Sequence, residues 1–217
     1  MKYLVAFLLF VSTSFAQTAK LKIIHFNDIH AQNTPLIIKR GDSTIRVGGF
    51  AHFKTVIDSL RRVASANGEG VLVLGAGDDF QGTLFSTMTR GGSQIALLNE
   101  LNPDAITLGN HDFDYGWANI DSLVKYQVKY PIVSSNLFFK NGKRMVKPYL
   151  IKETNSVRVG IIGMMTDNLP GLTLPRNIEN INIEKEADAL KKILPLVKKE
   201  KPDIIIVLGH LGFESDI

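Results

Sequence analysis

Four short apolar runs in this chain each pass into a cluster of carboxylate, amide or imidazole side chains. The runs and the clusters that follow them are Ile23–Phe26 with Asn27–His30, Val71–Ala76 with Gly77–Asp79, Ala105–Leu108 with Gly109–Asp114, and Ile204–Leu208 with Gly209–His210. Runs of this length, bounded by glycine and polar residues, are typical of strands that end in loops. Because such loops meet at the carboxyl edge of a sheet, we expect the four clusters to form one polynuclear metal site there.

Helical patterns alternate with these strands. An amphipathic segment opens after Gly48-Gly49 and stops near Asn67-Gly68, and further helices are expected over Ser93–Leu101, Trp117–Val128 and Glu184–Lys199. The first and last of the four apolar runs are expected to belong to the longer strands Lys20–Phe26 and Asp203–Leu208. Two further strands are expected at Pro131–Ser134 and Val157–Met164. This alternation predicts an α/β fold of layered, mixed β-sheets flanked by helices, with a metal site at the carboxyl ends of the strands.

Turn-forming residues mark the connections between these elements. Ala31–Arg46 is expected to be a polar loop with a turn at Gly41-Asp42. Asn141-Gly142 is expected to close a hairpin between the residues on either side of it. Pro195 is expected to distort or end the last helix, because its ring clashes with the preceding turn.

Residues 1–16 have the pattern of a secretory signal peptide. A basic start at Lys2 is followed by the apolar run Leu4–Val11 and by small residues at the −3 and −1 positions of a cleavage site after Ala16. The apolar run is shorter than the ~20 residues that a membrane-spanning helix needs. We therefore expect export to the periplasm or the extracellular space, and a single mature domain over 17–217.

The composition is that of a soluble globular protein, with 45% hydrophobic and 21% charged residues. No cysteine occurs, so an exported chain would fold without disulfides. The formal net charge of +4 is compatible with an anionic small-molecule substrate, and the scattered basic residues do not argue for a nucleic acid polymer. No second long apolar run predicts a membrane span in the mature chain. The last cluster lies so close to Ile217 that we expect the domain to be incomplete at its C-terminus.

The chemistry of the clusters favours transition metals. A carboxylate and an imidazole two residues apart, as in Asp28 and His30, suit Zn, Mn or Fe better than Ca, and they converge only if the backbone leaves the extended alternation. Either Asp78 or the adjacent Asp79 is placed to bridge two cations. Taken singly, Asp28 and Asp78 are better explained by a helix or turn cap, and His30 by an ordinary loop position. Only their recurrence on four strand ends favours a metal site.

The third cluster offers a different set of groups. Asn110 would give a neutral oxygen ligand, and His111 could either bind a metal or face the substrate. Asp114 is placed to orient the His111 ring and to stabilise its protonated form. The alternative for Asn110 and His111 is a turn with a capping asparagine.

Together these blocks resemble the calcineurin-like metallophosphoesterases. Within that superfamily, the run Gly109–Gly116 resembles the secreted 5′-nucleotidase and UDP-sugar hydrolase branch, as do Val47–Ala51, Asp79–Thr83 and Gly209–Glu214. The resemblance covers nearly the whole mature chain. It implies a metallophosphoesterase catalytic domain that lacks both a later Gly-His-x-His block and the domain that supplies nucleotide specificity.

The resemblance also implies a role for each matching residue. Asp28 and His30 would hold one divalent ion, Asp78 would bridge two, and Asn110 and His210 would hold the second. The ions would belong to the Zn, Mn, Fe or Co class. His111 would be the catalytic histidine beside the phosphate, supported by Asp114.

The function that follows is an exported dimetal phosphohydrolase of the 5′-nucleotidase kind. A water activated by the two metals would attack phosphorus and release phosphate from nucleoside monophosphates. Three alternatives keep the same fold and act on 2′,3′-cyclic nucleotides, UDP-sugars or a sulfur ester. A fourth, from another class, is an inactive fragment or binding module, because the last ligand block is missing.

Overall fold

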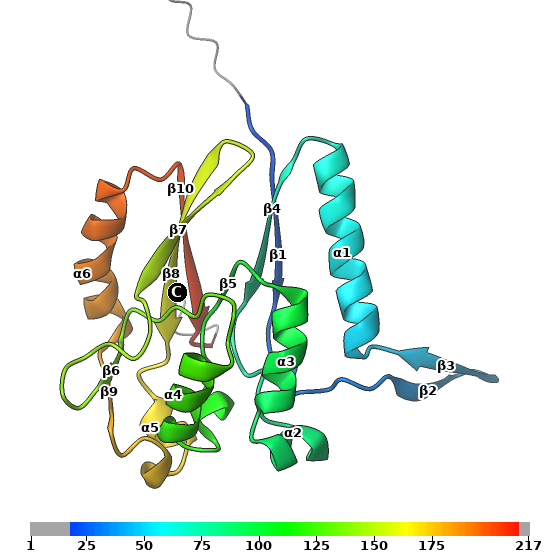
Figure 1. The fold of residues 1–217 in the computed structure, drawn as a ribbon, viewed down its shortest axis with the longest axis horizontal. Coiled ribbons are helices and arrows are strands. Elements are labelled where there is room, and N and C mark those ends of the chain that lie inside the picture. The colour runs from blue at the N-terminus through cyan, green and yellow to red at the C-terminus, as the bar shows by residue number, and fades with distance from the viewer. Residues whose placement is uncertain (1–17, 213–217) are drawn as a thin grey trace, which may run out of the picture.

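Two three-stranded β-sheets form the centre of the molecule, and the computed structural model describes residues 18–212 (Figure 1). The first sheet is all parallel, in the order β1 (Leu21–Phe26), β4 (Gly70–Gly75) and β5 (Ala105–Ile106). Residues 131–133 extend it through a parallel bridge between Ile106 and Ile132. Parallel strands need crossover connections, and helices provide them here.

The second sheet is mixed, in the order β10 (Ile204–His210), β8 (Val157–Met165) and β7 (Tyr149–Thr154). β10 runs parallel to β8, and β7 runs antiparallel to it. The two sheets meet through the segment 133–135, where the Ser135 N–H donates to the Gly163 carbonyl at 2.7 Å. The carboxyl ends of β4 and β10 lie close together, because the His210 ring at the end of β10 donates to the carbonyl of Ala76, directly after β4.

The four helices of ten or more residues were all expected. They are α1 (Phe50–Ala66), α3 (Gly92–Leu101), α4 (Trp117–Tyr126) and α6 (Glu186–Lys199). Figure 1 shows α1 beside the first sheet and α6 on the far side of the second. The buried side of α1 carries Phe50, Ile57 and Ala64 at seven-residue spacing, as the amphipathic pattern predicts. The α/β fold of several sheets flanked by helices is confirmed.

Pro195 does not end α6, which continues to Lys199. The helix keeps its course because Ile193 and Val197, on either side of the proline, are buried against Ile162 of β8. Tertiary packing therefore outweighs the lost backbone hydrogen bond.

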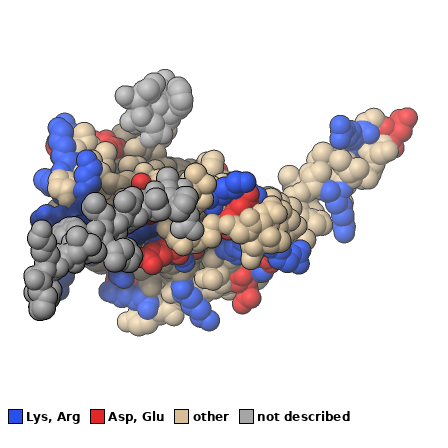
Figure 2. Space-filling view, turned by 90° about the horizontal axis from the view of Figure 1, so that it is seen from above, with Lys and Arg blue, Asp and Glu red and all other residues tan. Residues whose placement is uncertain are grey.

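The expectation of a polar loop over Ala31–Arg46 was wrong. An antiparallel hairpin, β2 (Leu36–Arg40) and β3 (Ser43–Val47), occupies most of it and turns at Gly41. All five residues of β2 are exposed, so no alternation of buried and exposed positions marked the strand. Figure 2 shows the hairpin projecting from the body of the molecule with Lys and Arg side chains along it.

Among the shorter elements, β7 and β9 were not expected. The expected hairpin turn at Asn141-Gly142 is present, because Phe138 and Arg144 form an antiparallel bridge and the Phe139 N–H donates to the Lys143 carbonyl at 2.8 Å. The strand before this turn, β6 (Leu137–Phe139), also pairs with β9 (Ile181–Ile183), and the buried Leu137 and Ile181 belong to one core. The remaining elements are α2 (Leu84–Thr89), η1 (His111–Phe113), α5 (Leu169–Leu172) and η2 (Pro175–Asn177).

The predicted signal peptide, residues 1–16, lies outside the described residues. Within residues 18–212, no helix combines the length and the apolar content that crossing a bilayer requires.

Candidate metal centre

The loops after β1 and β4 run side by side and continue the pairing of the two strands. The Asp28 N–H donates to the Gly77 carbonyl at 3.0 Å, and the His30 N–H donates to the Asp78 carbonyl at 3.0 Å. The Ala31 N–H continues the series to Asp79 at 3.1 Å. The first and second clusters are therefore held in register by backbone hydrogen bonds.

The backbone leaves the extended conformation at the candidate ligands themselves. Asp28, His30 and Asp78 have φ values of 53°, 47° and 59°, which non-glycine residues seldom adopt. Gly77 precedes Asp78 at φ 94°, where a side chain would be strained. Such strain costs about 1–3 kcal/mol per residue and is found mainly at functional sites. The expected departure from strand alternation is present.

Three candidate ligands form one compact group. Ligand atoms of Asp28, His30 and Asp78 all lie within 4.8 Å of one another. The Nε2 atom of His30 is 3.7 Å from Oδ1 of Asp28 and 3.8 Å from Oδ2 of Asp78. The Nδ1 atom of His30 lies 3.2 Å from the Gln81 carbonyl, so that carbonyl can accept from Nδ1 and leave Nε2 for the carboxylates.

His210 reaches the same carboxylate from the second sheet. Its Nδ1 donates to the Ala76 carbonyl at 2.8 Å, and its Nε2 lies 3.4 Å from Oδ2 of Asp78. The hydrogen bond with Asp78 raises the pKa of His210 to about 9. Burial opposes ionisation of Asp78, but the contacts with His210 and His111 outweigh it and hold the pKa of this carboxyl below its usual value. Asp78 is thus an anionic centre with a histidine on either side.

The third cluster is fixed to the second by Asp112, which sequence reasoning did not single out. Its buried carboxylate accepts from the N–H groups of Asp78, Asp79, Phe80 and Gly109, at 3.1, 3.0, 2.9 and 2.8 Å. Burial raises the pKa of Asp112 to about 6, and the backbone hydrogen bonds oppose that rise. The only signal in the sequence was its position inside the motif, since three of the four partners are more than thirty residues away.

Gly109 allows the two loops this close approach. A Cβ atom there would overlap the Asp78 carboxylate and the Asp78 backbone nitrogen. On the other side, the His111 N–H donates to Oδ1 of Asp78 at 2.8 Å. Asp78 is therefore in direct contact with the third cluster as well.

We expect Asp112→Ala to lower the free energy of unfolding by at least about 4 kcal/mol. Four buried N–H groups would lose their acceptor, at a cost of about 1–3 kcal/mol each before relaxation. Urea denaturation in the presence of a chelator would measure the change without a metal contribution.

Asp121→Ala is the matched control, because Asp121 pairs only with Lys125 on the surface of α4 among the described residues. A surface pair contributes less than about 1 kcal/mol. Equal losses in the two variants would contradict the role given to Asp112.

His111 and Asp114 form the predicted pair. The Nδ1 atom of His111 lies 2.8 Å from Oδ2 of Asp114, and this contact raises the pKa of His111. The rings of His111 and His30 approach edge to face with centroids 5.3 Å apart. The pair therefore lies beside the candidate metal ligands.

Two residues of the clusters behave differently from the rest. Asp79 is fully buried and its carboxylate has no hydrogen-bond partner among the described residues, and burial raises its pKa well above the usual value. Of the adjacent pair, Asp78 is therefore the one that faces the histidines. Asn110 lies on the loop of the third cluster, and within residues 18–212 its side chain makes no hydrogen bond to the other candidate ligands. Fold and site together define an α/β protein with a candidate metal centre at its sheet edge.

Comparison with known proteins identifies the family. The calcineurin-like phosphoesterase model matches residues 21–216. The chain is 35% identical over 210 residues to the 5′-nucleotidase of Bos taurus, covering 93% of this chain and 35% of that protein. The chain belongs to the calcineurin-like phosphoesterases, a family of metal-dependent phosphoric ester hydrolases. The predicted resemblance is confirmed.

Comparison with solved structures supports the same family. The 5′-nucleotidase precursor from Thermus thermophilus superposes with a TM-score of 0.78 at 28% identity, over 90% of this chain and 38% of that one. The NAD nucleotidase of Haemophilus influenzae gives 0.76 at 28% identity, over 90% and 35%. The chain thus spans little more than a third of the length of these relatives.

Proposed function

We propose that this chain is the catalytic part of an exported dimetal phosphohydrolase that releases phosphate from nucleoside 5′-monophosphates. The observation that carries the proposal is the arrangement around Asp78. One carboxylate oxygen lies within 3.8 Å of a histidine from each sheet, and the other accepts from the His111 backbone. The Asp78 carboxylate is thus approached from all three of the other strand-end clusters, by the side chains of His30 and His210 and by the backbone N–H of His111. Asp28 of the first cluster belongs to the same compact group of candidate ligands.

The residues present fit divalent ions. Asp28, His30 and Asp78 offer two carboxylates and an imidazole within 4.8 Å, a donor set that suits Zn, Mn, Fe or Co. His210 donates from Nδ1 to a backbone carbonyl, which fixes its ring and leaves Nε2 available, as is usual for metal-binding histidines. We assign Asp28 and His30 to one ion, His210 and Asn110 to a second, and Asp78 to both.

Side chains of the protein would then orient the phosphate and donate a proton or hydrogen bond to it. When bound, two divalent ions supply Lewis acidity and an activated water. Because Nδ1 of His111 faces Asp114, the other ring nitrogen is left to donate to a phosphoryl oxygen or to the leaving oxygen. Asp114 keeps the ring oriented and favours its protonated form. Backbone hydrogen bonds between the two loops hold Asp28, His30 and Asp78 in their strained conformation, so these candidate ligands are in place before substrate arrives.

The nucleotide substrate and the export are inferred from relatives and from the sequence. The bovine relative is named a 5′-nucleotidase, and the predicted signal peptide over 1–16 would direct the domain 17–217 out of the cytoplasm. The Haemophilus neighbour, named an NAD nucleotidase, makes a dinucleotide the second candidate substrate.

A substrate panel tests the proposal. With Mn²⁺ or Zn²⁺ added, we expect the chain to hydrolyse p-nitrophenyl phosphate and to lose this activity in EDTA. Among AMP, 2′,3′-cyclic AMP, UDP-glucose and NAD, we expect kcat/KM to be highest for AMP by at least about tenfold, a difference of ~1.4 kcal/mol in transition-state binding. Metal content, measured in parallel, separates failure to bind metal from failure to turn over.

The outcomes are distinct. Preference for the cyclic nucleotide, UDP-glucose or NAD would replace the nucleotidase assignment while keeping the hydrolase. A chain that retains two ions yet hydrolyses none of the five compounds would overturn the catalytic proposal in favour of a binding module.

A further inference from the structure

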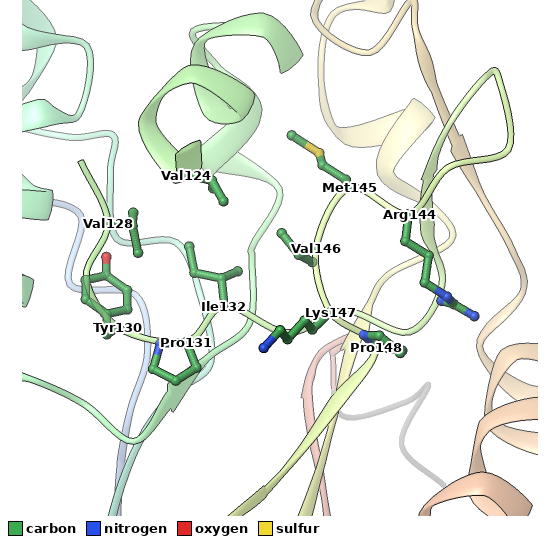
Figure 3. A pocket seen from close by; sticks show the side chains of 10 residues that line it. All are labelled: Val124, Val128, Tyr130, Pro131, Ile132, Arg144, Met145, Val146, Lys147 and Pro148. Atoms are coloured by element: carbon green, nitrogen blue, oxygen red, sulfur yellow. The ribbon is translucent and has the colours of Figure 1, made fainter. Parts of the chain in front are cut away.

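A pocket lies beside α4, at a place that the proposed hydrolysis does not use. It has a volume of about 650 Å³ and is bounded by the end of α4, the segment after it and residues 144–148 (Figure 3). Figure 3 shows the side chains of Val124, Ile132 and Val146 turned toward one another, with the Tyr130 ring beside Pro131. Clefts of about 300–1,000 Å³ are of the size that small-molecule ligands occupy.

The walls of the pocket are preformed. Tyr130, Ile132 and Val146 are each at least nine-tenths buried. Ile132 is bridged to Ile106 of the first sheet, and Val133 is bridged to Lys147 on the opposite wall. Backbone pairing therefore fixes the two walls relative to each other, and a ligand would lose little free energy in ordering them.

The charged residues that line the pocket are all positively charged. Eight of the ten lining residues are apolar or aromatic, and the two charged ones, Arg144 and Lys147, are both cationic. Such a pocket favours a ligand with an apolar body and an anionic group.

Lys147 is the cation free to meet that group. The Arg144 guanidinium donates to the Ser135 carbonyl and stacks 4.6 Å from the centroid of the Phe138 ring. Figure 3 shows it turned away from Ile132, whereas the Lys147 side chain extends past Ile132 in the direction of Pro131. Among the described residues, Lys147 makes no ion pair, unlike the nearby Lys152, which pairs with Asp104.

We propose that this pocket binds a small aromatic carboxylate, whose ring lies among the apolar walls and whose anionic group meets Lys147. This site is separate from the metal centre and does not depend on the proposed hydrolase activity.

The test is a titration of the chain with 2-naphthoate, followed by amide chemical shifts. We expect saturable shifts confined to residues 124–132 and 144–148, with a Kd on the order of 0.1 mM for a ligand of this size. The uncharged analogue 2-naphthalenemethanol should bind at least about tenfold more weakly, because it cannot pair with Lys147.

Two variants make the assignment specific. Lys147→Glu should weaken 2-naphthoate at least about tenfold, whereas Lys143→Glu should change it less than about twofold. Lys143 is the matched control, an exposed lysine on the same segment that does not line the pocket.

Any of three results would overturn the proposal. They are equal affinity for the acid and the alcohol, equal losses in the two variants, and shifts centred on the exposed side chains of α2 or on the Asp78 loop. A folded spectrum for both variants establishes that a loss of affinity reflects the pocket.

Discussion

Asp78→Ala is expected to remove bound metal and to lower turnover by at least about 10³-fold, which corresponds to ~4 kcal/mol of lost transition-state stabilisation. The physical reason is that Asp78 lies against candidate ligands from both sheets, His30 at 3.8 Å and His210 at 3.4 Å. Without the Asp78 carboxylate, no single anionic group would lie between His30 and His210 to hold both ions. Metal analysis of the purified chain and p-nitrophenyl phosphate hydrolysis measure the two effects.

Two further variants sharpen this test. Asp78→Asn preserves shape and one carbonyl oxygen, so it separates the effect of charge from that of a cavity. Asp42→Ala is the matched control, since Asp42 is an exposed carboxylate at the tip of the β2–β3 hairpin. A variant at Asp78 that keeps both ions would show that this residue does not bridge them.

His111→Ala should reduce turnover by about 10²–10⁴-fold while leaving metal content nearly unchanged. The reason is that the His111 ring is hydrogen-bonded to Asp114, at 2.8 Å, and is not itself a member of the compact group Asp28, His30 and Asp78, although it packs against the His30 ring. Its contact with Asp78 is made by the backbone N–H, which alanine retains. Metal content and kcat should therefore respond differently.

His52→Ala is the matched control for this substitution, because His52 is exposed on α1 and the one hydrogen bond that its ring makes among the described residues is to the Gly48 carbonyl. We expect it to change neither quantity. If His111→Ala lost metal in proportion to activity, His111 would be a ligand and the catalytic assignment would fail.

Local sequence patterns predicted much of the fold. Apolar spacing placed α1 and α6 to within a few residues, since buried positions such as Ile57 and Ile193 recur on one helix face. The same reasoning failed where burial did not alternate, as along the exposed β2 strand. It also failed where a partner was distant, as when β6 paired with β9 across about forty residues.

In the candidate site too, the local pattern was predicted and the distant contacts were not. The residue types at four strand ends identified Asp28, His30, Asp78, Asn110, His111, Asp114 and His210 as candidates, and their roles in metal binding and catalysis remain predictions. No local pattern indicated that Asp112 joins the second and third clusters, because its four donors are backbone N–H groups, three of them remote along the chain.

The sequence by itself determined the alternation of strands and helices, the family and the identity of the groups that could bind metal. These properties depend on side-chain type and short-range spacing, which the chain carries locally. Only the tertiary structure decided that His210 meets Asp78, because that contact requires β10 to pair with β8 and the two sheets to share one edge. It also decided that Asp78 and not Asp79 faces the histidines, since adjacent side chains point apart and one of them must enter the core.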